Sequence, residues 1–338
     1  MKKKALITGI TGQDGSYLSE FLLDKNYEVH GLIRRLSDGS FGQIKRCIDQ
    51  IVVHDGNLRD DEVITRVIKE VDPDEIYNLA AQSAVGISFD CPEETIDVNY
   101  NGLGRLVDAA IKFNPDVRIY QASTSEMFGN TPPPQNENSP FNPMSPYAES
   151  KLRAYKDYVR GYRNRYGIFI SSGILFNHES PRRGEYFVTR KISKALARIS
   201  LGIQDVLELG NLEAKRDWGF AGDYVEAMWL MLQQSIPDDY VVATGEAHSV
   251  KEFVETAAEV LGINIQWEGA GVQETGRNEN GKVIVRVNEK FYRPKDVNYL
   301  CGDNSKAKER LGWVPKMSFY ELVKKMVLFD LDNEKKMI

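Results

Sequence analysis

The feature that most constrains this chain is a glycine-rich turn that directly follows a short apolar run near its N-terminus. Residues 4–8 read as a buried strand, and glycines then stand at positions 9, 12 and 15. In a strand–turn–helix unit, such glycines permit the tight turn, let a pyrophosphate approach the backbone, and allow close packing of helix on strand. We therefore predict a dinucleotide site formed by Gly9, Ile10, Thr11, Gly12, Gln13, Asp14 and Gly15. The alternative is an ordinary strand–helix turn.

Short strand-like runs alternate with segments of helical periodicity through the first half of the chain. Parallel strands need crossover helices that cover both sheet faces, so the pattern predicts an α/β fold with a doubly wound, Rossmann-like parallel sheet. In such sheets, ligands bind beyond the carboxyl ends of the strands. The five predicted strands occupy residues 4–8, 28–33, 50–54, 75–80 and 118–122.

The end of the second predicted strand bears on the choice of dinucleotide. An acidic residue at this place grips the ribose hydroxyls of NAD, whereas an arginine accommodates the 2′-phosphate of NADP. Here the strand ends in Ile33-Arg34-Arg35. The sequence therefore favours NADP, with Arg34 and Arg35 as contacts; the alternative is that both arginines are simply solvated.

A candidate catalytic set follows the fifth predicted strand. Ser123-Thr124-Ser125-Glu126 comes first, and Tyr147 and Lys151 stand further on, after Ser145 and Pro146. Serine as an N-cap and proline at the first helical position predict a helix that carries Tyr147 and Lys151 on one face. We expect the lysine ammonium and an oxidised nicotinamide to lower the pKa of the phenol, which would make it a usable base. The pair alone could also be an exposed helix face.

The second half of the chain predicts a smaller lobe. A strand at 169–175 leads to Asn177-His178-Glu179, and the later helical segments are 188–200, 223–234, 250–261, 305–311 and 319–331, with a glycine- and asparagine-rich loop at 269–282. We predict a cofactor domain over residues 1–170, to which the chain returns around 211–234, and a substrate lobe of smaller α/β type over 171–338.

Composition excludes several classes of function. The formal net charge is −6, which argues against nonspecific nucleic-acid binding, and no apolar run reaches the roughly 18 residues that a membrane span needs. The three cysteines and four histidines are scattered, so neither a disulfide framework nor a metal site is expected. The default is a soluble, cytoplasmic protein that acts on a small molecule, without nucleic-acid or membrane partners.

Taken together, the turn, the Ser/Thr cluster and the Tyr-x-x-x-Lys helix resemble the extended short-chain dehydrogenase/reductase family. Longer segments resemble one branch of it, the GDP-mannose 4,6-dehydratases. These segments are residues 8–15, 78–83, 123–126, 173–184, 187–192, 210–218 and 291–294.

The resemblance implies an activity and roles for individual residues. The reaction would be an NADP-dependent internal redox dehydration of GDP-mannose, in which Tyr147 takes the proton of the 4-hydroxyl and Thr124 hydrogen-bonds the 4-oxygen. Glu126 would remove the proton on carbon 5, and Ser125 would orient the sugar or assist departure of the 6-hydroxyl. A plain dehydrogenase needs no such carboxylate, whereas an elimination does.

The resemblance also implies binding residues and an assembly. A homodimer or homotetramer is implied because the loop opened by Arg34 and Arg35 reaches a neighbouring subunit's cofactor in the family. For the GDP moiety the implied contacts are Asn177, Val188, Lys191, Arg216 and Arg293. Besides the residues above, the implied cofactor contacts are Asn57, Leu58, Leu79, Ala80, Ala81, Gln82, Ser83, Tyr147, Lys151, His178 and Arg183.

Some positions depart from the family pattern. Asn57 stands in place of aspartate, Ala84 in place of histidine and Glu94 in place of tyrosine. Two other functions remain open at this point. One is an NADP-dependent sugar-nucleotide epimerase or decarboxylase, which would not require Glu126 as a base, and the other is a catalytically silent NADP-binding regulatory protein.

Overall fold

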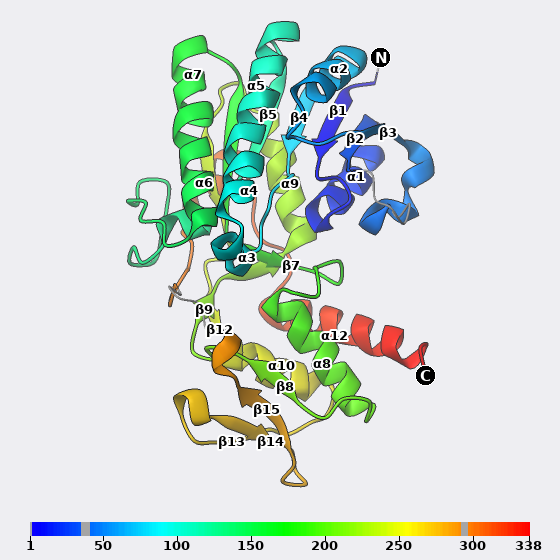
Figure 1. Ribbon diagram of the computed structural model, residues 1–338, viewed down its shortest axis with the longest axis vertical. Helices are drawn as coiled ribbons and strands as arrows, with labels where there is room; N and C mark the ends of the chain where they lie inside the picture. Colours follow the sequence, from blue (N-terminus) through cyan, green and yellow to red (C-terminus); the bar gives the residue numbers. More distant parts are fainter. Residues whose placement is uncertain (1, 35–40, 292–296) are drawn as a thin grey trace.

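The computed structural model describes residues 2–34, 41–291 and 297–338, and a seven-stranded parallel sheet lies at its centre (Figure 1). The strand order is β11-β6-β5-β4-β1-β2-β3. The doubly wound α/β fold predicted from the sequence is therefore confirmed. The strands are β1 (Lys4–Thr8), β2 (Glu28–Ile33), β3 (Ile51–Asp55), β4 (Glu75–Asn78), β5 (Arg118–Thr124), β6 (Ile170–Leu175) and β11 (Asp239–Val242).

β3, β4 and β5 end at other residues than predicted, and for β4 and β5 the reason is visible. β4 stops at Asn78 because the backbone N–H of Ala80 donates to the Thr8 hydroxyl, at 3.2 Å, rather than continuing a ladder. β5 continues to Thr124 because its last residues pair with the end of β6, with Thr124 opposite Leu175. β3 and β6 start one residue later than predicted. The polar end of β5 is thus held inside the sheet.

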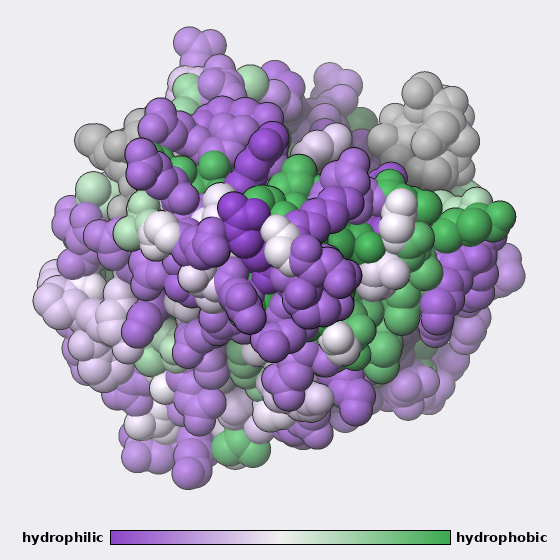
Figure 2. Space-filling model, turned by 90° about the horizontal axis from the view of Figure 1, so that it is seen from below, coloured by the Kyte–Doolittle hydropathy of each residue, from purple (hydrophilic) through white to green (hydrophobic). Residues whose placement is uncertain are grey.

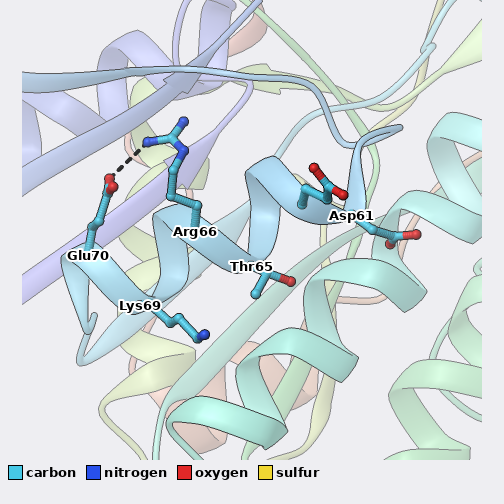
Figure 3. A pocket seen from close by; sticks show the side chains of 6 residues that line it. Asp61, Thr65, Arg66, Lys69 and Glu70 are labelled. Atoms are coloured by element: carbon cyan, nitrogen blue, oxygen red, sulfur yellow. Dashed lines mark hydrogen bonds and ion pairs between the residues drawn. The ribbon is translucent and has the colours of Figure 1, made fainter.

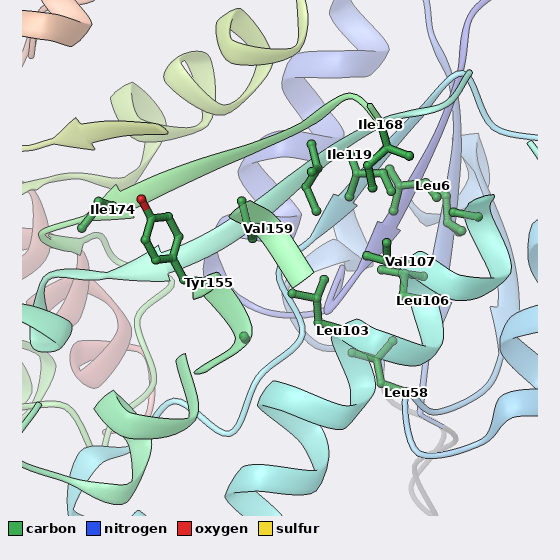
Figure 4. Packing of buried hydrophobic residues seen from close by; sticks show 14 of the residues in the cluster. Leu6, Leu58, Leu103, Leu106, Val107, Ile119, Tyr155, Val159, Ile168 and Ile174 are labelled. Atoms are coloured by element: carbon green, nitrogen blue, oxygen red, sulfur yellow. The ribbon is translucent and has the colours of Figure 1, made fainter. Parts of the chain in front are cut away.

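Helices cover both faces of the sheet. One face packs on α2 (Asp61–Val71), α5 (Gly102–Phe113) and α6 (Pro146–Ala154) with its continuations η5 (Tyr155–Arg160) and α7 (Gly161–Tyr166), and Figure 4 shows part of that core. The other face packs on α1 (Gln13–Asp24), α9 (Ala221–Leu232) and α11 (Ser305–Leu311). Shorter elements at the edges are η1 (Gly42–Arg46), η2 (Ile48–Gln50), α3 (Val85–Asp90), α4 (Pro92–Ile96), η3 (Asp97–Asn101) and η4 (Ser125–Phe128).

A second, smaller lobe lies below the carboxyl ends of the strands (Figure 1). Its four-stranded sheet has the order β13-β14-β15-β8, and a separate hydrophobic cluster joins this sheet to three helices. Two short ribbons, β7 with β10 and β9 with β12, also form there. The elements are β7 (Asn177–Glu179), α8 (Val188–Ser200), β8 (Leu207–Leu209), β9 (Lys215–Arg216), β10 (Trp218–Phe220), β12 (His248–Ser249), α10 (Val250–Val260), β13 (Gln266–Glu268), η6 (Gly271–Gln273), β14 (Thr275–Arg277), β15 (Val283–Val287), η7 (Glu289–Phe291) and α12 (Phe319–Lys335).

The chain returns to the first lobe more than once. α9 packs on α1, β11 pairs with β6 at the edge of the large sheet, and α11 packs against α9 and β11. The predicted return around 211–234 covers α9 but not β11 or α11. A division of the domains at residue 170 stays a prediction, since β6 and these later elements all complete the first lobe.

The outer surface of the second lobe is mainly hydrophilic in the view of Figure 2, with an apolar area on one side. Within the described ranges 2–34, 41–291 and 297–338, no helix combines the length and the apolar character that crossing a bilayer requires.

Candidate active site

The glycine-rich turn joins β1 to α1 with its backbone packed closely against neighbouring segments. Gly9 has φ +69°, and a Cβ there would lie 2.7 Å from the Ala80 nitrogen. A Cβ on Gly15 would lie 2.5 Å from the Gly9 oxygen. Gly12 is the N-cap of α1 and supplies no side-chain acceptor for the first-turn N–H groups. These free donors at the positive end of a helix suit a pyrophosphate.

Two alanine substitutions separate the structural glycine from the binding glycine. Gly15→Ala should destabilise the fold by about 1–3 kcal/mol, since its Cβ meets backbone atoms that cannot move aside. Gly12→Ala should change stability by less than about 1 kcal/mol, because the nearest atom is 3.3 Å away, yet should weaken NADP binding by crowding the turn. Urea denaturation and NADPH fluorescence titration measure the two effects. Equal losses of stability in both variants would contradict this assignment.

The predicted catalytic residues come together at the carboxyl end of β5. Thr124 ends β5, Ser125 and Glu126 begin η4, and the helix α6 presents Tyr147 and Lys151. The Ser145 hydroxyl caps α6 by accepting a hydrogen bond from the Ala148 N–H, at 3.1 Å, as the sequence predicted. All five side chains are buried, and Thr124 hydrogen-bonds the Tyr147 phenol. The chain therefore assembles a hydroxyl, a carboxylate, a phenol and an ammonium in one buried place.

The pKa of Tyr147 differs from the sequence-based expectation. Burial, with a smaller contribution from the negative charge of Glu126, raises the pKa to about 12, even though the Thr124 hydrogen bond and the Arg183 charge act to lower it. The lowering expected from Lys151 together with an oxidised nicotinamide is not produced by the chain's own residues, because desolvation disfavours the phenolate more than Thr124 and Arg183 stabilise it. The opposing effects also place Glu126 and Arg183 near the phenol.

Lys151 has a different partner from the one expected. Its Nζ donates to the Ala122 carbonyl oxygen at 2.8 Å, and burial lowers its pKa to about 8. The i, i+4 spacing correctly placed Lys151 on the helix face that meets β5. It could not specify the backbone carbonyl that this ammonium contacts.

Two polar features beside the site were missed from the sequence. Asn99, in the π-helical turn η3, binds both backbone groups of Gln82 at 2.9 and 3.0 Å and donates to the Ser150 hydroxyl of α6 at 3.1 Å. A buried ladder also links Thr8, Asn78 and Gln121 by side-chain hydrogen bonds of 2.6 and 2.7 Å. The available signal was a polar side chain inside an otherwise apolar helix or strand end. Both features fix the edge of the sheet at which the candidate site lies.

The side chains of His178 and Asp14, both predicted cofactor contacts, bind each other. His178 Nε2 lies 2.8 Å from Asp14 Oδ2, and its Nδ1 lies 2.8 Å from the Phe176 carbonyl oxygen. Both partners accept hydrogen bonds, so both ring nitrogens carry protons when both bonds form. Burial opposes the imidazolium and the carboxylate, but their mutual attraction and hydrogen bonds prevail, raising the pKa of His178 and lowering that of Asp14.

Gln13 reinforces this link between the two lobes. Its amide nitrogen donates to the His178 carbonyl oxygen at 3.0 Å, and its amide oxygen accepts from the Ser180 hydroxyl at 2.8 Å. The side chains of Gln13, Asp14 and His178 therefore fasten β7 to the glycine-rich turn. These side-chain atoms are already hydrogen-bonded within the chain. The predicted cofactor contacts of the three residues therefore remain predictions for their other atoms, such as the backbone N–H groups.

The Asp14–His178 pair predicts a pH-dependent stability. Asp14→Asn should cost about 1.5–3 kcal/mol of unfolding free energy where both charges are present. The raised His178 pKa gives stabilisation that is complete below 6.5 and declines as the pH rises through the raised value. The lowered Asp14 pKa gives stabilisation that is complete above 3.8 and declines as the pH falls through the lowered value. Urea denaturation should thus show the largest difference from wild type between pH 3.8 and 6.5. A difference independent of pH up to pH 9 would contradict the ion pair.

Arg183 is a candidate anion contact with unused donors. Its guanidinium is mostly buried, and Nε lies 3.0 Å from Glu179 Oε2 without hydrogen-bond alignment. The ring of Phe187 lies 3.5 Å from the guanidinium carbon. Within the described part of the chain this guanidinium donates no hydrogen bond, so its donors remain for a phosphate of a bound nucleotide.

The other predicted cofactor residues lie along the same sheet edge, but several of their side chains are engaged. Ile10 and Leu58 belong to the hydrophobic core, so their contacts remain predictions for the backbone only. The Gln82 side chain binds Thr95 and the backbone of Ala84, and the Asn57 side chain accepts from the Arg59 N–H at 3.1 Å. Thr11, Leu79, Ala80, Ala81, Ser83 and Arg34 follow β1, β4 or β2, whereas Arg35 lies outside the described residues.

Four of the five predicted substrate residues belong to elements of the second lobe. Asn177 begins β7, Val188 begins α8, Arg216 ends β9, and Arg293 lies outside the described residues. Lys191 of α8 lies 3.4 Å from the centre of the Phe291 ring. Both residues line a hollow of about 300 Å³ together with Leu207 and Glu208. The hollow offers an aromatic ring, aliphatic walls and a cation.

Another hollow, of about 550 Å³, lies on the outer face of α2 (Figure 3). It is lined by residues such as Thr65, Lys69 and the i, i+4 ion pair of Arg66 and Glu70, at 2.9 Å. None of the predicted site residues lines it, and we regard it as a solvated helix surface. No cluster of metal-ligand type is present in residues 2–34, 41–291 and 297–338.

The parallel sheet, the glycine-rich turn and the Tyr–Lys helix define a protein of the short-chain dehydrogenase/reductase type. Residues 6–326 match the model of the family described as GDP-mannose 4,6 dehydratase. The chain belongs to the GDP-mannose 4,6-dehydratase family.

Similar proteins agree with this assignment. The human GDP-mannose 4,6 dehydratase is 53% identical, with 97% of this chain and 91% of the human protein covered. The Vibrio cholerae GDP-mannose 4,6-dehydratase is 47% identical, with 98% and 94% covered. Among solved structures, the Thermus thermophilus UDP-glucose 4-epimerase in complex with NAD has a TM-score of 0.79 at 27% identity, covering 97% of this chain and 98% of that one.

Proposed function

We propose that this chain converts GDP-mannose to GDP-4-dehydro-6-deoxymannose and water, and that Thr124, Glu126, Tyr147 and Lys151 carry the reaction. The activity is that of the family to which the chain belongs. The observation that supports this use of the residues is a buried carboxylate, Glu126, close enough to the Tyr147 phenol to raise its pKa. A plain alcohol oxidation requires the phenol, whereas removal of water requires a second acid–base group.

NADP is the cofactor of this family, as the sequence predicted. When bound, it would supply the hydride acceptor for oxidation at carbon 4 of the sugar and the hydride donor for reduction at carbon 6. The donors present suit such a dinucleotide: the uncapped N-terminus of α1 would hold the pyrophosphate, Arg34 follows β2, and the Arg183 guanidinium has unused donors. No acidic residue follows β2 directly, which favours the 2′-phosphate form.

The chain's own residues handle the protons. Tyr147 takes the proton of the 4-hydroxyl as carbon 4 is oxidised, and Thr124 hydrogen-bonds the same oxygen. The resulting ketone acidifies the proton on carbon 5, which Glu126 removes and can pass to the departing 6-hydroxyl, so that water leaves. Ser125 orients the sugar. As carbon 6 is reduced, carbon 5 takes up a proton, and Tyr147 gives up the one that it took from the 4-hydroxyl, so the protons balance. Carbon 4 is oxidised and carbon 6 reduced, so the overall reaction needs no external oxidant.

The GDP end of the substrate would extend toward the second lobe. Arginine and lysine suit a diphosphate, and Arg216 and Lys191 come from β9 and α8 on that side. The hollow beside Lys191 and Phe291 has room for a nucleoside base and presents an aromatic ring to it. Asn177 and Val188 complete this proposed contact set, and Arg293 follows the η7 turn in the sequence.

Incubation with GDP-mannose in ordinary and deuterated water, followed by NMR, tests the proposal. We expect a new methyl doublet in ordinary water and deuterium at carbon 5 in deuterated water. Unchanged sugar would favour a silent NADP-binding protein, and an epimerised or decarboxylated sugar would favour the related activities.

We further propose that the chain works as a homodimer or homotetramer in the cytoplasm. The family resemblance supports the assembly, because the segment that Arg34 opens reaches a neighbouring subunit in the family. Light scattering at micromolar concentration should give a mass of two or four chains. A monomer mass would contradict this proposal without affecting the catalytic one.

A further inference from the structure

A buried ion pair joins the C-terminal helix to the beginning of α8. The Arg190 guanidinium donates through Nε and Nη2 to both carboxylate oxygens of Asp330, at 2.6 to 3.0 Å. The Ser193 hydroxyl donates to Asp330 Oδ2 at 2.6 Å. Arg190 is 8% exposed and Asp330 is 2% exposed. The bonds to both carboxylate oxygens fix the orientation of the guanidinium plane, and the Ser193 bond fixes the carboxylate.

The remaining nitrogen of that guanidinium binds the loop of residues 181–183, which includes the predicted cofactor contact Arg183. Arg190 Nη1 donates to the Pro181 carbonyl oxygen and, at 3.1 Å, to the Arg183 carbonyl oxygen. Arg190 of α8 therefore holds the backbone of residues 181–183, and Asp330 of α12 holds the Arg190 side chain in place. Figure 1 shows α8 and α12 in the second lobe, below the large sheet.

Arg183 is the residue of this loop with a direct bearing on the site. Its guanidinium forms an ion pair with Glu179 at 3.0 Å but donates no aligned hydrogen bond in the described part of the chain, and its charge acts on Tyr147 and on Asp14 of the glycine-rich turn. The direction in which the Arg183 guanidinium points therefore depends on the position of the backbone of residues 181–183. A displacement of about 1 Å in such a group can cost about a hundredfold in rate.

We propose that Arg190 and Asp330 are positioning residues that hold residues 181–183 and thereby direct the Arg183 guanidinium to a nucleotide phosphate. This inference rests on the proposed function. A buried ion pair is in general a weak source of net stability, because desolvation offsets the attraction between its charges. The Arg190 guanidinium binds one carboxylate and two backbone carbonyl groups in a fixed geometry. This positioning role explains the buried ion pair better than a contribution to the free energy of unfolding does.

The test is a double-mutant cycle on cofactor binding. Asp330→Asn keeps the side-chain shape but removes the charge, and we expect about a tenfold to hundredfold weaker affinity for NADPH in fluorescence titration. In an Arg183→Gln background the same substitution should change the affinity by less than about twofold, because the group it positions is gone. A purely structural role would give equal effects in both backgrounds and would overturn the proposal.

Controls keep the result interpretable. Asp332→Asn makes the same chemical change at an exposed position of α12 and should leave the affinity unchanged. If Asp330→Asn fails to fold, Ser193→Ala removes one bond to Asp330 and should weaken binding by about twofold to fivefold, again only when Arg183 is present. An unchanged affinity in Ser193→Ala together with a folded, unaffected Asp330→Asn would also overturn the proposal.

The titration also separates this inference from the proposed function. A wild-type protein that binds NADPH but leaves GDP-mannose unchanged would contradict the proposed reaction, and the cycle on NADPH affinity would still decide the role of Arg190 and Asp330. With an active enzyme, Asp330→Asn should in addition move the pH dependence of kcat to higher pH, since the Arg183 charge lowers the pKa of Tyr147.

Discussion

Replacing Tyr147 with phenylalanine should reduce turnover of GDP-mannose by about 10²–10⁴-fold while leaving substrate binding nearly unchanged. The phenol is the group that takes the proton of the 4-hydroxyl, and phenylalanine keeps the ring and its packing. The pKa of about 12 in the isolated chain means that the phenol is protonated at neutral pH, so the rate should rise as the pH increases. Steady-state kinetics and an isothermal titration with GDP-mannose measure the two quantities.

A matched control is available about two helical turns beyond Tyr147, at the start of η5. Tyr155 is also buried and its hydroxyl donates to Asp239 at 2.8 Å, but this contact lies at the edge strand β11. Tyr155→Phe should lower stability by about 1–2 kcal/mol and leave turnover per folded molecule unchanged. Full activity in Tyr147→Phe would exclude the phenol as the catalytic base.

Replacing Glu126 with glutamine should also reduce turnover by about 10²–10⁴-fold, and it should abolish deuterium incorporation at carbon 5. Glutamine has nearly the same shape but cannot accept the carbon-bound proton. Because the Glu126 charge raises the pKa of Tyr147, the substitution should not impair the phenol itself. NMR of the sugar in deuterated water checks the predicted loss.

The exposed carboxylate of Glu149, on α6, provides the comparison for this substitution. Glu149→Gln makes the same chemical change on the outside of the helix that carries Tyr147 and should retain normal turnover. Deuterium at carbon 5 in the Glu126→Gln variant would show that another group removes this proton. The reaction class could then stand, but the role of Glu126 could not.

Local patterns predicted much of the fold. The bounds of β1, β2, α8 and α11 agree residue by residue with the sequence-based ranges, because apolar periodicity and flanking turn residues act over short distances. β11 was not assigned to the large sheet. Its pairing with β6 depends on a segment more than 60 residues away in the sequence, and no local signal specifies that partner.

The candidate site was predictable in its residues but not in their partners. A motif correctly brought Thr124, Glu126 and Tyr147 to one sheet edge. It could not show that Lys151 contacts a backbone carbonyl or that Asp14 pairs with His178, since either choice depends on the three-dimensional position of a distant segment. The raised pKa of Tyr147 in the chain alone was not predicted for the same reason: the extent of burial is a tertiary property.

β11 lies more than 60 residues after β6, the strand with which it pairs, and this order has a consequence for folding during synthesis on the ribosome. Asp239, the first residue of this strand, accepts hydrogen bonds from Arg163 and Tyr155, and α9 covers the helix that follows the first strand. A nascent chain that ends near residue 175 therefore lacks an edge strand and one helical cover of its large sheet. We expect the N-terminal half to remain incompletely folded until α11, which ends at Leu311, has emerged from the ribosome. Both lobes would then acquire their final structure together.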